Sequence, residues 1–113
     1  MRINRVPNGL KVTHSAYQAG LAKIGEYRQQ YSALLDRWDI LITPSIPVEA
    51  PADLTTIGEP PFNGIWTGLY GPAINLPLYA GPLGLPIGLQ IIGHSARNDK
   101  FLNAADAIYG ALQ

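Results

Sequence analysis

Two pairs of neighbouring residues could supply a nucleophile and a base, namely His14–Ser15 and His94–Ser95. An imidazole beside a serine can take its hydroxyl proton, and a carboxylate such as Asp99 can orient the ring, so a triad is conceivable at His94. Neither serine lies in the Gly-x-Ser-x-Gly turn that exposes such nucleophiles. We therefore interpret His94–Ser95 as a turn at a strand end whose polar groups face water.

The residue types support a metal site or a phosphate-binding loop even less. The chain has no cysteine and only two histidines, far apart in sequence, which is too few ligands for a metal site. The glycines at 81, 84 and 88 are not followed by the Gly-Lys-Ser/Thr of a phosphate-binding loop. We assign no catalytic residue, no metal ligand and no cofactor.

Charge excludes two classes of partner. The formal net charge is zero, only 14% of residues are charged, and no like charges cluster. This pattern argues against nucleic acid and against a polybasic membrane surface. With no cysteine and no signal-peptide or membrane-spanning stretch, the sequence suggests a cytoplasmic protein. A charged fraction well below the usual value of about 25% suggests apolar surface meant for a partner.

The first half of the chain must provide a helix and a strand. Residues 15–38 carry apolar residues at spacings of three and four, and Thr13 or Ser15 could cap this helix. Gly20 and Gly25 within it suggest close packing against a neighbour. Residues 40–43 form an unbroken apolar run, which predicts a strand buried on both faces. Residues 44–61 hold five of the ten prolines and predict a long proline-rich loop.

The second half predicts a short helix near residues 62–69, strands at 73–79 and 85–92, and a closing helix at 99–112. Pro77 places the end of the first of these strands at an edge or a bulge. The order predicts one α/β domain over residues 1–113. Three helices can hardly cover both faces of a sheet with such apolar strands, so the fold is expected to be incomplete by itself.

Four segments, in this order, resemble the C-terminal region of amidase-signature hydrolases. They are Trp38-Asp-Ile-Leu-Ile-Thr-Pro44, Phe62-Asn-Gly-Ile-Trp-Thr-Gly68 with Gly71-Pro-Ala-Ile-Asn-Leu-Pro77, Gly84-Leu-Pro-Ile-Gly-Leu-Gln-Ile-Ile-Gly93, and the closing helix. The similarity covers residues 9–112. The resemblance implies a mixed sheet flanked by helices, of which this chain supplies the C-terminal part, and relatives that include amidotransferase A subunits.

The resemblance also implies amide hydrolysis by a Ser–Ser–Lys arrangement that lies upstream of this region. The serines here are Ser15, Ser32, Ser45 and Ser95, and none lies in the glycine-rich loop of that motif. By the resemblance, the proline-rich loop and Asn63, Trp66, Thr67 and Tyr70 help to shape a substrate channel. Trp66 also fits a core position, and Asp39 and Gln90 are expected to fix turns and strand edges.

Two hypotheses follow. In the first, the chain is a C-terminal fragment of an amidase-type hydrolase that lacks the catalytic residues, is inactive alone, and meets a small amide substrate only in the complete enzyme. Its partner is then the missing amidase N-terminal region. In the second, the chain is a non-catalytic binding or assembly module that forms a homo-oligomer through its exposed sheet.

Overall fold

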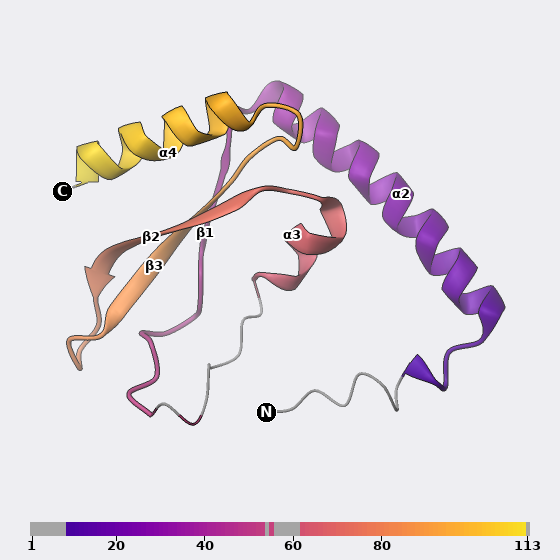
Figure 1. The fold of residues 1–113 in the computed structure, drawn as a ribbon, viewed down its shortest axis with the longest axis horizontal. Coiled ribbons are helices and arrows are strands. Elements are labelled where there is room, and N and C mark those ends of the chain that lie inside the picture. Colours follow the sequence, from indigo (N-terminus) through magenta and orange to yellow (C-terminus); the bar gives the residue numbers. More distant parts are fainter. Residues whose placement is uncertain (1–8, 54, 56–61, 113) are drawn as a thin grey trace.

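Three helices and longer loops surround a small sheet in the computed structural model, which describes residues 9–53, 55 and 62–112 (Figure 1). The elements in chain order are α2 (His14–Arg37), β1 (Leu41–Pro44), α3 (Gly64–Leu69), β2 (Ala73–Ala80), β3 (Pro86–Ile92) and α4 (Asn98–Leu112). The predicted α/β class and the order of elements are confirmed.

The three strands form an antiparallel sheet with the order β1-β3-β2. Leu41 pairs with Ile92 in β3, and Ala73 of β2 pairs with the same residue from the other side. Pro77 is predicted to lie at an edge or a bulge, and β2 is an edge strand whose ladder shifts register between Pro77 and Tyr79. The central β3 holds the most buried positions of the sheet.

The prediction that residues 40–43 are buried on both faces is wrong for this chain. β1 lies at the edge of the sheet, its burial alternates along the strand, and the Ile42 side chain is 51% exposed. Alternation is what a strand shows when only one of its faces is covered. The apolar run gives the strand, but no described residue covers its second face.

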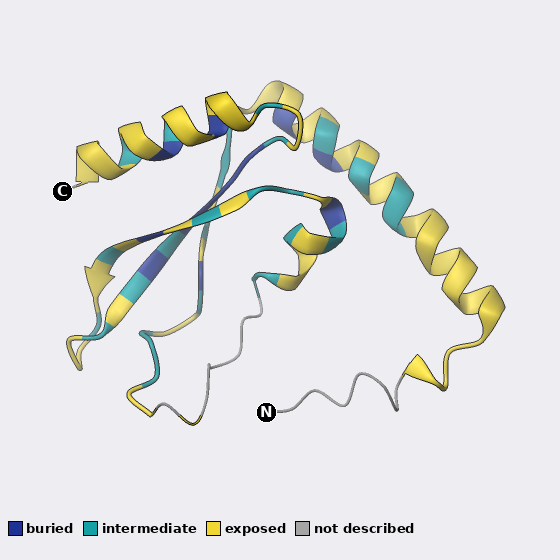
Figure 2. Cartoon of the chain, viewed as in Figure 1, coloured by how far each residue is buried: buried dark blue, intermediate teal, exposed yellow. Residues whose placement is uncertain are grey.

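Of the two predicted caps of helix α2, Thr13 and Ser15, the structure uses Thr13. The Thr13 hydroxyl accepts a hydrogen bond from the Ala16 amide at 3.2 Å, and the helix ends before Trp38. Only part of its apolar face is covered, because Tyr31 and Leu35 are buried whereas the residues nearer its N-terminus are exposed (Figure 2). The exposed large residues of the predicted stripe are Tyr17, Leu21, Leu34 and Trp38.

Two small cores lie on opposite faces of the sheet. Since neighbouring strand residues point to opposite faces, Ile92 and Ile91 face different helices. Ile92 packs with Tyr31 and Leu35 of α2 and with Leu69 of α3. The second cluster joins Ile91 and Leu76 of the sheet to Phe101 and Ala105 of α4. Each face therefore has a cover, but only over part of its area.

The molecule is consequently flat and wide. Its principal extents are 49 × 39 × 16 Å and its radius of gyration is 16.8 Å, whereas a compact domain of this length has about 13 Å. Among the described residues, eight hydrophobic side chains are buried and sixteen large ones are exposed. The expectation that this fold is incomplete by itself agrees with these dimensions.

Candidate functional site

A row of polar side chains crosses the sheet on the face that carries Ile92. Gln90 in β3 pairs with Thr43 of β1 on one side and with Asn75 of β2 on the other. All three side chains point the same way because paired residues share a face of the sheet. The row continues the face that α2 and α3 cover, beyond the point where the apolar cluster ends.

Gln90 is the centre of a hydrogen-bond network. Its side chain is 8% exposed, and its Oε1 accepts from the Trp66 indole at 3.0 Å and from the Thr43 hydroxyl at 3.3 Å. Its Nε2 donates to the Asn63 Oδ1 at 2.9 Å. An indole nitrogen can only donate, so the Gln90 oxygen must face Trp66 and its nitrogen must face Asn63. The network therefore fixes α3 to the sheet in one orientation.

Ser45 and Asn75 form the other side of this region. Ser45 is buried, its amide donates to the Gly88 carbonyl at 3.0 Å, and its hydroxyl donates to the Asn75 side-chain oxygen. A β-carbon at Gly88 would collide with the Asn75 carboxamide in its present position. The backbone of β3 thus leaves room for the Asn75 amide to lie across it.

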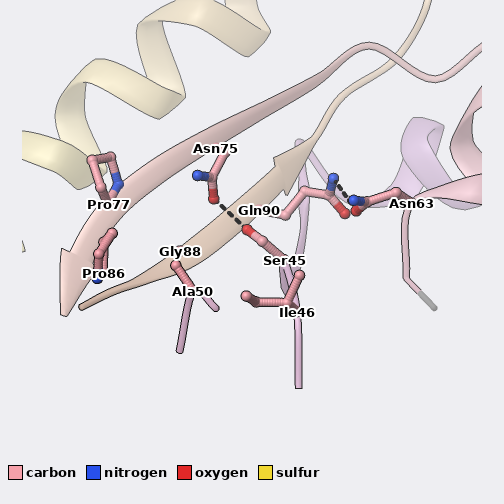
Figure 3. A pocket seen from close by; sticks show the side chains of 9 residues that line it. All are labelled: Ser45, Ile46, Ala50, Asn63, Asn75, Pro77, Pro86, Gly88 and Gln90. Atoms are coloured by element: carbon pink, nitrogen blue, oxygen red, sulfur yellow. Dashed lines mark hydrogen bonds between the residues drawn. The ribbon is translucent and has the colours of Figure 1, made fainter. Parts of the chain in front are cut away.

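These residues surround a hollow of about 330 Å³ (Figure 3). Its polar lining comes from Ser45, Asn63, Asn75 and Gln90, and its apolar lining includes Pro77 and Pro86. No charged side chain occurs among the described residues that line it. The hollow can bind a small uncharged group, but its lining holds no imidazole, lysine or carboxylate to activate a hydroxyl.

The structure separates the four residues predicted to shape a substrate channel. Asn63 lines the hollow, and Trp66 reaches Gln90 through its indole while it packs against the core cluster of Tyr31. Thr67 and Tyr70 are exposed and are not among the residues that line the hollow. Two of the four are therefore joined through Gln90, and the other two lie apart.

Tyr70 instead ends α3 and contacts α2. It adopts a left-handed backbone conformation with φ 59°, a position that favours glycine. The Arg28 guanidinium lies 3.7 Å from the centre of its ring, and the Arg28 Nε donates to the Gly68 carbonyl at 2.9 Å. Arg28 thus holds the end of α3 against α2.

Sequence reasoning missed Ser45, Asn75 and Gly88 as parts of a site, and it treated Gln90 as structural. Gln90 does have a structural role, but in the central strand and not at an edge. The available signal was the pair of polar residues Asn75 and Gln90 inside otherwise apolar strands. That signal becomes informative only when the register places both on one face.

His94 does not take part in a triad. Its Nδ1 accepts from the Ala96 amide at 3.0 Å, so the neutral ring carries its proton on Nε2, which lies 2.9 Å from the Ser32 hydroxyl. A ring nitrogen that donates to a serine cannot also take the serine proton. The sequence predicts that this ring faces water, but it is half-buried. It connects the turn before α4 to α2 through Ser32.

The described part of the proline-rich loop lies along the β2–β3 turn. The Glu49 carboxylate accepts from the Leu83 amide at 3.1 Å and from the Leu85 amide at 3.2 Å, and the Ala50 amide donates to the Pro86 carbonyl at 3.1 Å. Residue 54 and residues 56–61 of the predicted loop lie outside the described residues. The first half of the loop therefore borders the hollow near the start of β3, where Ala50 and Pro86 both line it.

Two further features of the described residues bear on function. No group of three or more histidine, cysteine or acidic side chains in this part of the chain is arranged to hold a metal ion. Among its helices, none has the length and apolar composition needed to cross a bilayer.

Comparison with known proteins finds relatives of this chain. No protein-family model matches the chain. The chain is 37% identical to the A subunit of the glutamyl-tRNA(Gln) amidotransferase of Prochlorococcus marinus (strain MIT 9312), over 69% of its own length and 18% of the relative. It is 32% identical to the corresponding protein of Neisseria meningitidis serogroup A over 86% of its length and 22% of that relative.

A solved structure agrees with these sequence matches. The substrate complex of 6-aminohexanoate cyclic dimer hydrolase superposes with a TM-score of 0.75 at 27% identity, over 95% of this chain and 26% of that one. The chain thus spans about a fifth to a quarter of the length of the proteins it matches. Sequence and fold together identify the chain as a C-terminal region of the amidase-signature hydrolase family.

Proposed function

We propose that the chain is the non-catalytic C-terminal part of an amidase-type hydrolase, whose complete form hydrolyses amide C–N bonds. The supporting observation is the likeness, over 95% of the chain, to 6-aminohexanoate cyclic dimer hydrolase. The absence of a base beside the hollow, among the described residues that line it, agrees with this division of roles. Alone, the chain is expected to be inactive.

In this proposal α3 and the sheet face present a wall to a small amide substrate. Asn63 and Trp66 are positioned by Gln90, as described above. Thr67 and Tyr70 are exposed at the same short helix and would contact substrate only where the complete enzyme brings it past them. The catalytic serines and lysine come from the N-terminal region of the family, and the complete enzyme is expected in the cytoplasm.

The uncovered apolar surface supports a protein partner for this chain. Tyr17 and Leu21 of α2 and Ile42 of β1 are 55%, 46% and 51% exposed. Apolar surface spread over several elements is typical of an interface with further protein. The remainder of the hydrolase fold is the partner that we propose.

The experiment is a chimera with the solved relative. The quarter of 6-aminohexanoate cyclic dimer hydrolase that this chain matches is replaced by this chain, and hydrolysis of the cyclic dimer and of simple amides is measured. We expect the isolated chain to release no amine and the chimera to hydrolyse amides. A folded chimera without activity would contradict the proposal.

Activity of the isolated chain would also contradict it, provided that contamination is excluded. Variants Ser32→Ala and Ser45→Ala serve this purpose, since an activity that belongs to the chain and uses either hydroxyl would fall with one of them. An activity that neither variant lowers, and that fades with further purification, comes from a contaminant.

The alternative is a self-associating binding module, and the same exposed side chains favour it. A homodimer would bury one copy's sheet face against the other's by two-fold symmetry. Light scattering distinguishes the two, because a stable homodimer at micromolar concentration supports the module, and a monomer that binds an apolar dye supports the missing hydrolase part.

A further inference from the structure

One side chain fastens the start of the proline-rich loop to the β2–β3 turn. The Glu49 carboxylate is half-buried and accepts hydrogen bonds from the Leu83 amide at 3.1 Å and from the Leu85 amide at 3.2 Å. Hydrogen bonds to an ionised acceptor are roughly twice as strong as those between neutral groups. The two amides follow Glu49 by 34 and 36 positions, so the contact joins two separate segments of the chain.

The turn leaves two of its amides for this carboxylate. The Gly81 and Gly84 amides donate to carbonyls within the turn, at 2.8 and 2.9 Å. The prolines of the turn have no N–H. The amides that remain are those of Leu83 and Leu85, and Glu49 accepts from both.

Gly81 shows how closely the Glu49 side chain lies against the turn. A β-carbon at Gly81 would collide with the carboxylate and with the β-carbon of Glu49. The backbone of Gly84 is in the left-handed region, whereas that of Gly81 is not. An alanine at Gly81 would therefore act through this collision and not through backbone strain.

The segment that Glu49 fastens, residues 45–50, forms one wall of the hollow (Figure 3). Ser45, Ile46 and Ala50 line the hollow from this segment, and most of its other lining residues belong to β2 and β3. The first and last residues of the segment donate backbone hydrogen bonds to β3 at 3.0 and 3.1 Å. The position of the segment therefore sets the width of the hollow on that side.

We propose that Glu49 is a positioning residue, which holds residues 45–50 against the β2–β3 turn and so limits the bulk of the group that can enter the hollow. Glu49 is not among the lining residues, so it acts through the segment and not by contact with a ligand. Without the carboxylate, the end of the segment at Ala50 keeps its backbone hydrogen bond to β3 but loses its charged attachment. The inference rests on the proposed function only for the ligand's being part of a substrate.

Thiol labelling measures the width of the hollow without any substrate. The chain has no cysteine, so Ala50→Cys places a single thiol in the lining. Its reaction rates are measured with methyl methanethiosulfonate, which is small, and with the bulkier benzyl methanethiosulfonate. The ratio of the bulky to the small rate, divided by the same ratio in the urea-unfolded chain, reports the bulk that the hollow admits. A change in the reactivity of the thiol itself affects both rates and cancels in this ratio.

Two variants should raise this ratio about tenfold or more, because a hydrogen bond to a charged acceptor is worth about that factor in the equilibrium that opens the segment. Glu49→Ala removes the acceptor, and Gly81→Ala displaces it. Glu49→Gln keeps one acceptor oxygen and should lie between. Asp53→Ala removes a carboxylate of the same loop, which contacts Thr55, and is the matched control. An unchanged ratio in Glu49→Ala and Gly81→Ala, or an equal rise in Asp53→Ala, would overturn the proposal.

Hydrogen exchange gives an independent measure of the same contact. In Glu49→Ala the Leu83 and Leu85 amides should exchange about tenfold faster or more, whereas the amide of the buried Ile91 should keep its rate. An equal acceleration at Ile91 would show that Glu49 supports the whole fold and would contradict the proposal. Unprotected Leu83 and Leu85 amides in the protein with Glu49 would contradict it as well.

These measurements need no amide hydrolysis, so they separate the two proposals. An inactive chimera would count against the proposed function alone. An unchanged labelling ratio beside an active chimera would count against the role of Glu49 alone.

Discussion

Gln90 shows how one residue can hold several elements together and also line a hollow. It is buried in the central strand and connects β1, β3 and α3 through three hydrogen bonds. A buried carboxamide with partners on both its oxygen and its nitrogen has a single allowed orientation. This fixed orientation holds the Gln90 nitrogen on Asn63, which also lines the hollow.

Gln90→Leu should therefore destabilise the chain by about 2 kcal/mol, because the Trp66 indole and the Asn63 oxygen lose their partner together. Thr43→Val removes one hydroxyl, which can donate either to Gln90 at 3.3 Å or to the Pro44 carbonyl at 3.1 Å, and should cost about 0.5 kcal/mol. Urea unfolding followed by Trp fluorescence measures both. Equal midpoints for the two variants would show that Gln90 is not the centre of the network.

Tyr31 gives the chain a pH dependence at the alkaline end. Burial raises the pKa of Tyr31 to about 12, and its hydroxyl donates to the Gly93 carbonyl. Above the unfolded pKa of about 10, the unfolded chain loses this proton while the folded chain keeps it. Stability from Tyr31 is therefore complete below pH 10 and is lost as the pH rises to about 12.

The expected loss across this range is about 3 kcal/mol for the wild type. Tyr31→Phe removes the hydroxyl and should lack that part of the alkaline decline, although its stability at neutral pH is lower by the lost hydrogen bond. Chemical unfolding at pH values across the window measures both. Parallel stability curves for the two proteins would show that the buried hydroxyl does not titrate as described.

At the scale of elements, the glycines differ in whether another segment packs closely against them. A β-carbon at Gly93 would collide with the Phe101 ring, so β3 and α4 depend on this glycine for their contact. At Gly20 and Gly25 of α2 no atom lies within 4 Å of the corresponding position. The close packing expected for these two helix glycines is not made by the described part of the chain.

Gly93→Ala should cost about 2 kcal/mol or more, because the Phe101 ring must leave its place in the core. Gly25→Ala should stabilise the isolated chain by up to about 1 kcal/mol, since alanine favours the helix and nothing obstructs it. Thermal unfolding of both variants measures the contrast. A stabilising Gly93→Ala would show that β3 and α4 do not approach as closely as described.

Gly25→Ala also tests the partner of α2. In the hydrolase chimera the same alanine would meet neighbouring protein if α2 packs there. A variant that stabilises the chain but lowers the stability of the chimera would place an interface at this helix.

At the scale of the whole molecule, the main feature is that more large apolar side chains are exposed than are buried among the described residues. The body is flat, and its two small cores on opposite sheet faces leave much apolar surface uncovered. In both proposals above, association with a second copy or with the rest of a hydrolase would cover this surface. Its strength should depend on the uncovered faces of β1 and α2.

Ile42→Glu should leave the unfolding midpoint of the monomer nearly unchanged, because this side chain is 51% exposed. It should weaken association about tenfold or more, since a charge would be buried at the new interface. Leu83→Glu, a 73% exposed position in the β2–β3 turn, is the control. Sedimentation at several concentrations measures the constants, and equal values for both variants would exclude β1 from the interface.

The helices and strands could be predicted from the sequence because each has a local cause. The Thr13 cap and the three-and-four spacing define α2, and Pro77 marks the irregular part of β2. The ordered motifs around Trp38, Phe62 and Gly84 also sufficed to identify the family, since they are read without knowing any contact.

The polar site, in contrast, could be found only in three dimensions. Asn75 and Gln90 lie in different strands, and the register places them side by side on one face with Ser45 and Asn63. The uncovered Ile42 is a second case, because an apolar run shows that a strand prefers burial but not whether this chain supplies the cover. Strand pairing and burial arise from contacts between distant residues, which local spacing does not contain.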